Sequence, residues 1–271
     1  MLNKKENNII EPRYQRLVAQ MVNDKKLPQI VYRMRSVNSF LYDSLINNQL
    51  WFSNPQDFND PFDCDINMTF KKSSLARKQS YFDNYLKPLF NARELTNINT
   101  SNISNADFEI LLNRAAKKIV RRKGLACFLS NCDNLLMWAH YADSHRGVCL
   151  KFDVLEDTTF FSPAKAVSYT QEYPEYDYLD NKNDFVNEMF FTKSNEWSYE
   201  GEVRVLKNRK GNYSFKPKAL KEIILGCKIT ENDKITLIKL IKRFYPHCNI
   251  KLAVMDSHSF SLNFINAPSD N

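Results

Sequence analysis

The stretch CFLSNCDNLLMWAHYADSHRGVCLKFDV, residues 127–154, has the pattern of a strand, a helix and a second strand. Residues 125–129 form an apolar run of strand length, and residues 134–142 have helical spacing behind Asp133, a residue type that caps helices. After Gly147, apolar and polar side chains alternate towards residue 154, as in a sheet strand. This central block predicts that strands and helices are mixed along the chain.

The same mixture continues on both sides of the central block. Further strands are predicted at residues 30–35, 50–53, 197–206, 222–225 and 250–254, helices at 40–47, 185–192 and 233–244, and a loop at 173–180. Helical spacing at residues 72–90 and 106–122 predicts a helical insertion at about residues 71–123. We therefore expect an α+β fold, with a mixed, mostly antiparallel sheet and flanking helices.

Domain boundaries follow from this element order. Residues 1–29 predict an N-terminal tail and a helix that starts at Pro12, because proline is common in the first helical turn. Residues 30–256 predict a single α+β domain that includes the insertion, and residues 257–271 predict a C-terminal tail.

Composition and charge restrict the class of protein. The 271 residues are 43% hydrophobic and 13% aromatic, which is enough for a substantial core. A net charge of +7 permits, without requiring, an anionic partner such as a dinucleotide, tRNA or DNA. Six irregularly spaced cysteines and the lack of a leader segment predict reduced thiols and a cytoplasmic protein. No apolar run reaches the roughly 18 residues that cross a bilayer, so we expect no membrane partner.

Several common site types do not fit the sequence. Cys127, Cys132, His140 and His145 lie close together, but their spacings are not those of a zinc finger, so we expect no metal. Nothing near Cys132 marks its thiol as an activated nucleophile with His140 as base. The five glycines are scattered, which excludes a P-loop and a Rossmann motif.

A constellation of residues far apart in sequence has a coherent chemistry. Arg33 lies in the first predicted strand, Ser130 follows the central strand, and Glu200 and Glu202 begin a later strand, where a spacing of two places them on one face. An arginine can bind a pyrophosphate, a serine hydroxyl can hold a ribose, and a glutamate can stabilise an oxocarbenium ion. The sequence alone leaves open that Arg33 pairs with a core carboxylate and that both glutamates lie on a solvated strand face.

Aromatic residues accompany this constellation. Tyr32, Tyr141 or Tyr199 could stack on a nicotinamide ring, because each combines an apolar face with a polar hydroxyl.

Seven blocks spread over residues 30–255 resemble the bacterial family called Domain of Unknown Function 2971. They are YR at 32–33, LWFSNP at 50–55, FNDPFD at 58–63, CFLS at 127–130, MWAHYAD at 137–143, Gly147, and WSYEGEVR at 197–204. The family name implies no activity.

The order of these blocks is also similar to ADP-ribosyltransferases of the arginine-serine-glutamate type. That resemblance implies that Arg33 binds NAD, that Ser130 supports the nicotinamide ribose, that Glu202 is the catalytic glutamate and that Glu200 positions the acceptor. The transferases usually read Ser-Thr-Ser where this chain reads Leu129-Ser130-Asn131, so Ser53 competes for the serine role.

Some residues of the family blocks have no counterpart in the transferase pattern. They are Trp138, His140, Tyr141 and the loop at residues 58–63, and they either bind substrate or pack the loop over the sheet. We include Tyr141 and His140 with Tyr32 as candidate NAD-binding residues.

These observations predict an NAD-dependent, ADP-ribosyltransferase-like enzyme that cleaves the nicotinamide glycosidic bond and transfers ADP-ribose to an unknown acceptor, a protein, a nucleic acid or a small molecule. An alternative is a non-catalytic module, in a bacterial defence or toxin system, that binds a nucleotide or nucleic acid through Arg33 and Arg35. A third is a metal-dependent hydrolase or nuclease built on His140, His145 and Asp143.

Overall fold

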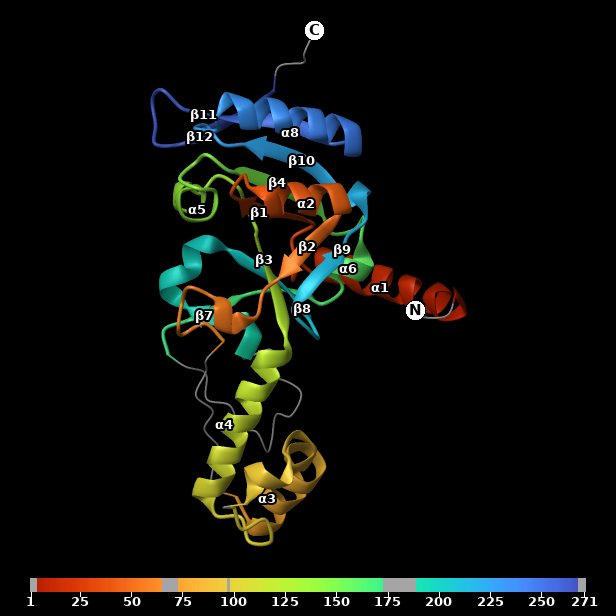
Figure 1. Cartoon of the computed structure of the whole chain (residues 1–271), viewed down its shortest axis with the longest axis vertical. Helices are drawn as coiled ribbons and strands as arrows, with labels where there is room; N and C mark the ends of the chain where they lie inside the picture. The colour runs from red at the N-terminus through yellow and green to blue at the C-terminus, as the bar shows by residue number, and fades with distance from the viewer. Residues whose placement is uncertain (1–3, 65–72, 97, 173–188, 268–271) are drawn as a thin grey trace.

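The computed structural model describes residues 4–64, 73–96, 98–172 and 189–267 (Figure 1). An eight-stranded sheet forms its centre, in the order β12-β11-β10-β4-β1-β3-β8-β5. Its strands are β1 Ile30–Arg35, β3 Gly124–Leu129, β4 Val148–Asp153, β5 Ala164–Ala166, β8 Glu202–Lys207, β10 Leu220–Leu225, β11 Asn249–Met255 and β12 Leu262–Asn266. Within this sheet β10 and β11 are parallel and the other neighbours are antiparallel, so the predicted mixed, mostly antiparallel sheet is confirmed.

Two small sheets accompany the large one. Strands β2 (Gln49–Phe52) and β9 (Gly211–Ser214) are antiparallel, whereas β6 (Ser168–Thr170) and β7 (Thr192–Ser194) are parallel. The helices are α1 Lys4–Asn23, α2 Ser39–Asn47, α3 Leu75–Tyr81, α4 Asn105–Arg122, α5 Leu135–Tyr141, α6 Thr158–Phe161 and α8 Glu231–Phe244. Short turns of 3₁₀ or π helix are η1 Pro55–Asp57, η2 Phe82–Leu86, η3 Lys87–Leu89, η4 Ala92–Leu95, η5 Asn195–Glu200 and η6 Pro217–Ala219.

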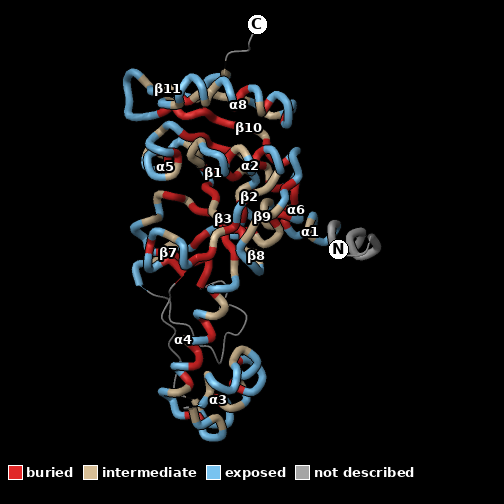
Figure 2. Tube along the Cα trace, viewed as in Figure 1, coloured by how far each residue is buried: buried red, intermediate tan, exposed pale blue. Residues whose placement is uncertain are grey.

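Each face of the large sheet is covered by helices. One face packs against α1, α2 and α8 through Val18, Leu41 and Leu237, which are all fully buried. The opposite face packs against α5, whose Trp138 is fully buried and donates from its ring nitrogen to the carbonyl of Cys132 at 2.7 Å. Figure 2 shows the buried segments concentrated along the central strands. This packing gives the sheet a distinct core on each side.

The helical insertion extends from one end of the molecule (Figure 1). It comprises α3, η2, η3, η4 and α4, and it has its own apolar cluster around Phe82, Phe108 and Leu112. The side-chain amide of Asn54 donates to the carbonyls of Val120 at 3.2 Å and Arg121 at 2.9 Å. These bonds add acceptor contacts at the carbonyls that end α4, and they fix the insertion to the sheet.

Strands β1 and β3 are neighbours in the sheet but barely paired. β1 pairs with β4 along its whole length, and β3 does the same with β8. In the part of the chain that the structure describes, the ladder between β1 and β3 is the single pair Tyr32–Leu129. At the other end of β3, Ser53 exchanges two backbone hydrogen bonds with Leu125, at 2.9 and 2.8 Å. β1 and β3 therefore separate beyond the Tyr32–Leu129 pair, and the segment after β2 pairs with the other end of β3.

Several predicted elements need correction. Residues 197–206 are not one strand, because η5 ends at Glu200 and Gly201, with φ of 54°, turns the chain into β8. Helix α1 starts at Lys4 and contains Pro12, whose ring removes one helical hydrogen bond, instead of starting there. The predicted tail at 257–271 contains β12, which pairs with β11.

The cap and the first insertion helix also differ from the prediction. Asn134, instead of Asp133, caps α5 by accepting from Leu136 N at 2.9 Å. The helix predicted at residues 72–90 breaks after α3 into a π turn and a 3₁₀ turn that contains Pro88. The predicted loop at 173–180 and residues 185–188 of the predicted helix at 185–192 lie outside the described residues; residues 189–191 are helical and Thr192 begins β7. No helix among the described residues is long and apolar enough to cross a membrane.

Candidate functional site

A cavity of about 190 Å³ lies where β1 and β3 diverge. Its walls come from both strands, from the segment after β2, from α5 and from the segment around η5. The lining residues are Arg33, Met34, Arg35, Ser53, Phe58, Asn59, Asp63, Leu125, Cys127, Leu129, Met137, Tyr141, Lys193, Glu200 and Glu202. The cavity therefore gathers Arg33 and both predicted glutamates from distant parts of the sequence.

Arg33 provides the cationic wall of the cavity. Its side chain is only 8% exposed, and its guanidinium carbon lies 5.5 Å from the centre of the Phe128 ring. Nη2 donates to the carbonyl of Trp51 at 3.0 Å, whereas Nη1 is buried and has no hydrogen-bond partner among the residues that the structure describes. Burial, with a contribution from Arg35, lowers the pKa of Arg33 to about 9, so it stays protonated at neutral pH. A buried donor of this kind is unfavourable unless a ligand satisfies it.

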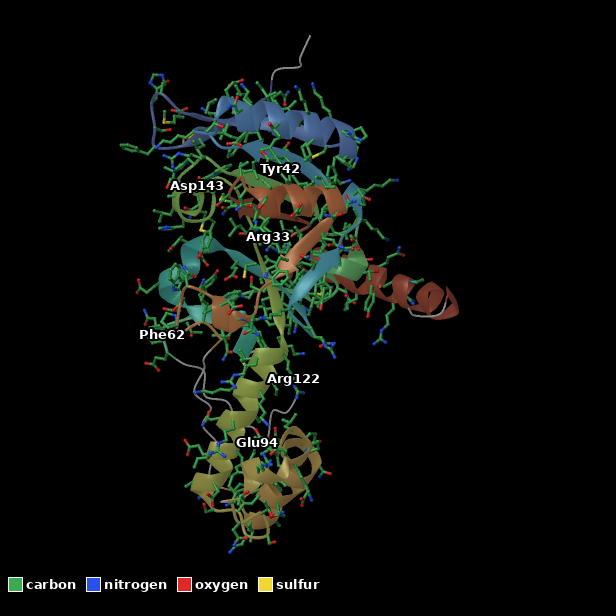
Figure 3. All side chains as sticks on the ribbon, viewed as in Figure 1. Arg33, Tyr42, Phe62, Glu94, Arg122 and Asp143 are labelled. Atoms are coloured by element: carbon green, nitrogen blue, oxygen red, sulfur yellow. The ribbon has the colours of Figure 1, made fainter. Side chains whose placement is uncertain are left out.

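Figure 3 shows Arg33 near the middle of the molecule, at the level of β1 and β2. In the register of β1 with β4, Arg33 is opposite Leu150 and so shares the face that packs against α1 and α8. Leu129 and Glu202 are paired across β3 and β8 on the other face. Because β1 and β3 diverge, side chains from both faces reach the same cavity.

Glu202 is held by a buried ion-pair network. It is 4% exposed, and Arg204, two residues along β8, donates from Nε and Nη2 to its two carboxylate oxygens at 2.9 Å each. The same guanidinium donates to Asp63 Oδ1 from Nη1 at 2.8 Å. Although burial acts to raise it, Arg204 and Lys193 hold the pKa of Glu202 below its ordinary value. Glu202 is therefore ionised and firmly oriented.

Glu200 has different partners. Tyr141 Oη donates to Glu200 Oε1 at 2.9 Å, and Lys193 Nζ donates to Oε2 at 2.6 Å. Burial raises the pKa of Glu200, against the opposing effect of Lys193. The amide of Asn134 donates to the carbonyl of Tyr199 at 2.8 Å, which ties the start of α5 to η5. The Tyr141–Glu200 contact thus rests on two linked elements.

The charges of this network nearly cancel. Three carboxylates, Asp63, Glu200 and Glu202, face two cations, Lys193 and Arg204, and Lys193 Nζ lies 3.5 Å from Glu202 Oε2. One negative charge remains, which suits a ligand group that is or becomes positive, while Arg33 suits a negative one.

The two candidate serines differ in position. Ser53 lines the cavity and is held by its backbone bonds to Leu125. Ser130 is exposed and is not among the lining residues; its backbone N–H donates to the carbonyl of Gly201 at 2.8 Å. A side chain at Gly201 would meet the Ser130 hydroxyl, so Ser130 packs against the turn between Glu200 and Glu202.

The candidate aromatic and histidine residues also differ in whether they line the cavity. Tyr141 lines the cavity, but Tyr32 packs with the α5 core, where burial raises its pKa to about 12. His140 is exposed and its ring lies 6.3 Å from that of Tyr141. Tyr199 is half-buried and lies outside the lining. Of this group, the structure brings Tyr141 alone to the cavity among the residues that it describes.

A strained turn fixes α5 beside β4. Asp143, Ser144 and His145 all have positive φ, of 47°, 54° and 69°, a conformation that costs energy for residues other than glycine. Figure 3 shows Asp143 at this turn. The ring of His145 stacks near Trp138, with centroids 6.4 Å apart, and lines a separate cavity.

The turn at residues 143–145 does not supply a metal site for the hydrolase or nuclease alternative. Over the described ranges, no group of three or more His, Cys, Asp and Glu side chains is placed to hold a metal ion.

Two lining residues, Lys193 and Asp63, and the Arg204 that binds Asp63 have no role predicted from the sequence. Lys193 lies outside every quoted block, and Asp63 and Arg204 were quoted without a role. The spacing of Glu202 and Arg204, opposite charges two apart on a strand, could have indicated their ion pair.

Comparison with known proteins adds one finding. Residues 137–205 match the model of a family described as Protein of unknown function (DUF2971). The match runs from α5 to β8 and includes Tyr141, Glu200 and Glu202, and it confirms over this region the family resemblance predicted from the sequence. Searches of curated proteins and of solved structures gave no match to the chain.

Proposed function

We propose that this chain binds NAD between β1 and β3 and cleaves its nicotinamide glycosidic bond, as an ADP-ribosyltransferase-like enzyme. The observation that supports this proposal is the presence, in one cavity, of Arg33 with an unsatisfied donor and of the carboxylates Glu200 and Glu202. Such a set can hold an anionic group at one side and stabilise positive charge at the other.

Arg33 is the residue proposed to hold a phosphate of NAD. Its free Nη1 donor is buried and its other terminal nitrogen is already fixed by Trp51, so the guanidinium is oriented before a ligand arrives. Arg35 lines the same cavity, and burial lowers its pKa. Guanidinium groups bind phosphate oxygens with strong, directional hydrogen bonds.

Glu200 is the carboxylate proposed to contact the nicotinamide ribose. Each of its oxygens has one donor, from Tyr141 or Lys193, and a carboxylate has about four acceptor positions. It can therefore accept a ribose hydroxyl as well, and its charge would stabilise an oxocarbenium ion. Glu202 is more fully occupied by Arg204, so its proposed contribution is a fixed negative charge beneath the site.

The cavity is large enough to enclose only part of an NAD molecule. At about 190 Å³ it is smaller than the roughly 300–1,000 Å³ of typical pockets for drug-sized ligands. It would take the nicotinamide ribose end with its adjacent phosphate, with Ser53 and Tyr141 beside it, and leave the adenosine end outside.

The test is the release of nicotinamide from NAD, measured by chromatography. We expect release by the native protein and a fall of about 10²–10³-fold in Glu200→Gln, the range for loss of one preorganised electrostatic contact. Glu196→Gln is the matched control, because Glu196 is an exposed carboxylate on the same 3₁₀ turn. Equal rates in the two variants would overturn the role of Glu200.

A non-catalytic nucleotide-binding module is the second candidate. The observation that favours it is that Arg204, Lys193 and Tyr141 already bind both carboxylates. Binding of NAD in calorimetry, lost in Arg33→Ala, with no nicotinamide released, would select this module instead of the enzyme.

A further inference from the structure

The C-terminal half of α4 is a strongly basic surface. After Glu109 the helix and the next residue contain six cations and no carboxylate: Arg114, Lys117, Lys118, Arg121, Arg122 and Lys123. Lys118 pairs with Glu94 at 2.6 Å. Lys117, Arg121 and Arg122 are exposed, and no carboxylate among the described residues lies within ion-pair distance of them. Figure 3 shows Arg122 at the end of α4 next to the sheet.

This surface borders a groove that leads to the site between β1 and β3. A cavity of about 540 Å³ between α4 and residues 55–64 includes Lys117 and Arg121. It shares Asn113 and Lys117 with a hollow of about 430 Å³ along α4. It also shares Phe58 and Asp63 with the 190 Å³ cavity. The 540 Å³ cavity therefore adjoins both of the others, and together with the hollow along α4 it forms the groove.

Carboxylates in the groove have other partners or lie far from its basic end. Asp63 is bound by Arg204, and Asp60 Oδ1 accepts the backbone N–H of Phe62 at 2.9 Å. Glu109 lies two helical turns before Lys117. The lining of the 540 Å³ cavity thus has two cations, Lys117 and Arg121, on α4 and two carboxylates, Asp60 and Asp63, on the facing segment, and the excess of positive charge lies on the α4 side.

We propose that this groove binds single-stranded nucleic acid. Lys117 and Arg121 are one helical turn apart, a rise of about 6 Å, which suits neighbouring phosphates of an extended strand. Phe58 lines the groove and is half-buried, so it offers an aromatic face on which a base can stack. A base can stack on such a ring only when it is not paired within a duplex, so the groove favours a single strand.

Binding of a single strand in this groove does not depend on the proposed function. The service of that strand as an acceptor of ADP-ribose rests on the proposed function. The groove and the proposed NAD site share Phe58 and Asp63 in their linings, so a strand bound in the groove would place a nucleotide beside that site as the acceptor of ADP-ribose.

The test measures binding of fluorescently labelled mixed-sequence single-stranded DNA and RNA by anisotropy, without NAD, over a range of salt. We expect Lys117→Glu with Arg121→Glu to weaken binding at least 10-fold. The slope of log affinity against log salt should fall by about 1.4, because two phosphate contacts are lost. The control is Lys239→Glu with Arg243→Glu, which has the same spacing on the exposed face of α8 and the same change in net charge; it should change affinity less than twofold.

Three outcomes would overturn the proposal. They are no binding of either single strand, equal losses in the two double variants, and tighter binding of a duplex or of an acidic peptide than of the single strands. The binding assay contains no NAD, so it is independent of the nicotinamide assay. If single strands bind but the protein releases no nicotinamide from NAD, only the proposed enzyme is overturned. If the protein releases nicotinamide but binds no single strand, only the nucleic-acid groove is overturned.

Discussion

Arg204 joins Glu202 to Asp63, so that one fully buried guanidinium connects β8 to the segment that follows β2. Its Nε lies 2.9 Å from Glu202 Oε1, and its Nη1 lies 2.8 Å from Asp63 Oδ1. Nη1 also donates to the carbonyl of Phe190 at 2.9 Å. These bonds hold three separate segments around one wall of the cavity.

Replacing Arg204 by methionine should strongly destabilise the fold. The substitution leaves Asp63 and Glu202 buried without their cation, and breaking a buried pair from one side costs about 3–5 kcal/mol. The free energy of unfolding from urea denaturation measures this loss. Arg243→Met, at an exposed position of α8, is the control and should change it by less than about 0.5 kcal/mol. A loss below about 1 kcal/mol for Arg204→Met would contradict the network's structural role.

Arg33→Met should have the opposite effect on stability. Among the described residues its Nη1 is a buried donor without a partner, and an apolar side chain of similar length removes this cost of about 2 kcal/mol while giving up a bond from Nη2 to the Trp51 carbonyl worth about 1 kcal/mol, a net gain of about 1 kcal/mol. We expect the free energy of unfolding to rise by about that amount while the thermal shift produced by NAD disappears. A variant that is destabilised would show that Arg33 serves the fold instead of a ligand.

Glu202 should make stability depend on pH in the acidic range. Arg204 holds its folded pKa below the ordinary 4.5, against the effect of burial, so below about pH 5 the unfolded chain binds more protons. The contribution is present above pH 4.5 and is lost as the pH falls through the folded pKa. Burial raises the pKa of Glu200, so its contribution has the opposite sign: it is present below pH 4.5 and is lost as the pH rises.

Urea denaturation from about pH 7 to about pH 3.5 tests both signs. Glu202→Gln should flatten the acidic loss of stability relative to the native chain, whereas Glu200→Gln should not. An unchanged profile in Glu202→Gln would rule out this carboxylate as the source.

Gly147→Ala should damage the connection between α5 and β4. A Cβ at this position would lie 2.2 Å from the carbonyl oxygen of Arg35 and 2.9 Å from the backbone of Ala142. Backbone atoms cannot move aside as a flexible side chain can, so β1 and α5 would have to shift. We expect loss of more than about 2 kcal/mol and a change in near-ultraviolet circular dichroism as Trp138 repacks. Gly211→Ala is the comparison, since a Cβ there meets no atom within 4 Å, although its φ of 143° adds some strain.

Sequence reasoning located most regular elements because their patterns are local. The apolar stripe of α4 and the alternation of β4 each appear in one continuous segment. The error at Trp197–Glu200 arose from a short alternation that a 3₁₀ turn also satisfies. Gly201 was the available signal, because a glycine in the left-handed region commonly ends a helical turn.

The site was less accessible from sequence because it depends on a divergence of strands. Arg33 and Glu202 belong to different faces by register, and no residue pattern announces that β1 and β3 separate. The choice between Ser53 and Ser130 was likewise undecidable, since both follow a strand and the backbone bridge to Leu125 decides which one lines the cavity. Long-range pairing, which sequence encodes weakly, determines both outcomes.

The near absence of a ladder between β1 and β3 has a mechanical consequence. An ordinary sheet resists being pulled apart sideways, because many backbone bonds would have to break together. Here the two halves meet along a seam closed by Tyr32 and Leu129 at one end and by Ser53 and Leu125 at the other. The backbone bonds of each half are therefore made largely within that half, and side-chain packing, such as that of the Phe128 and Phe152 rings with centroids 5.8 Å apart, joins the two across the seam.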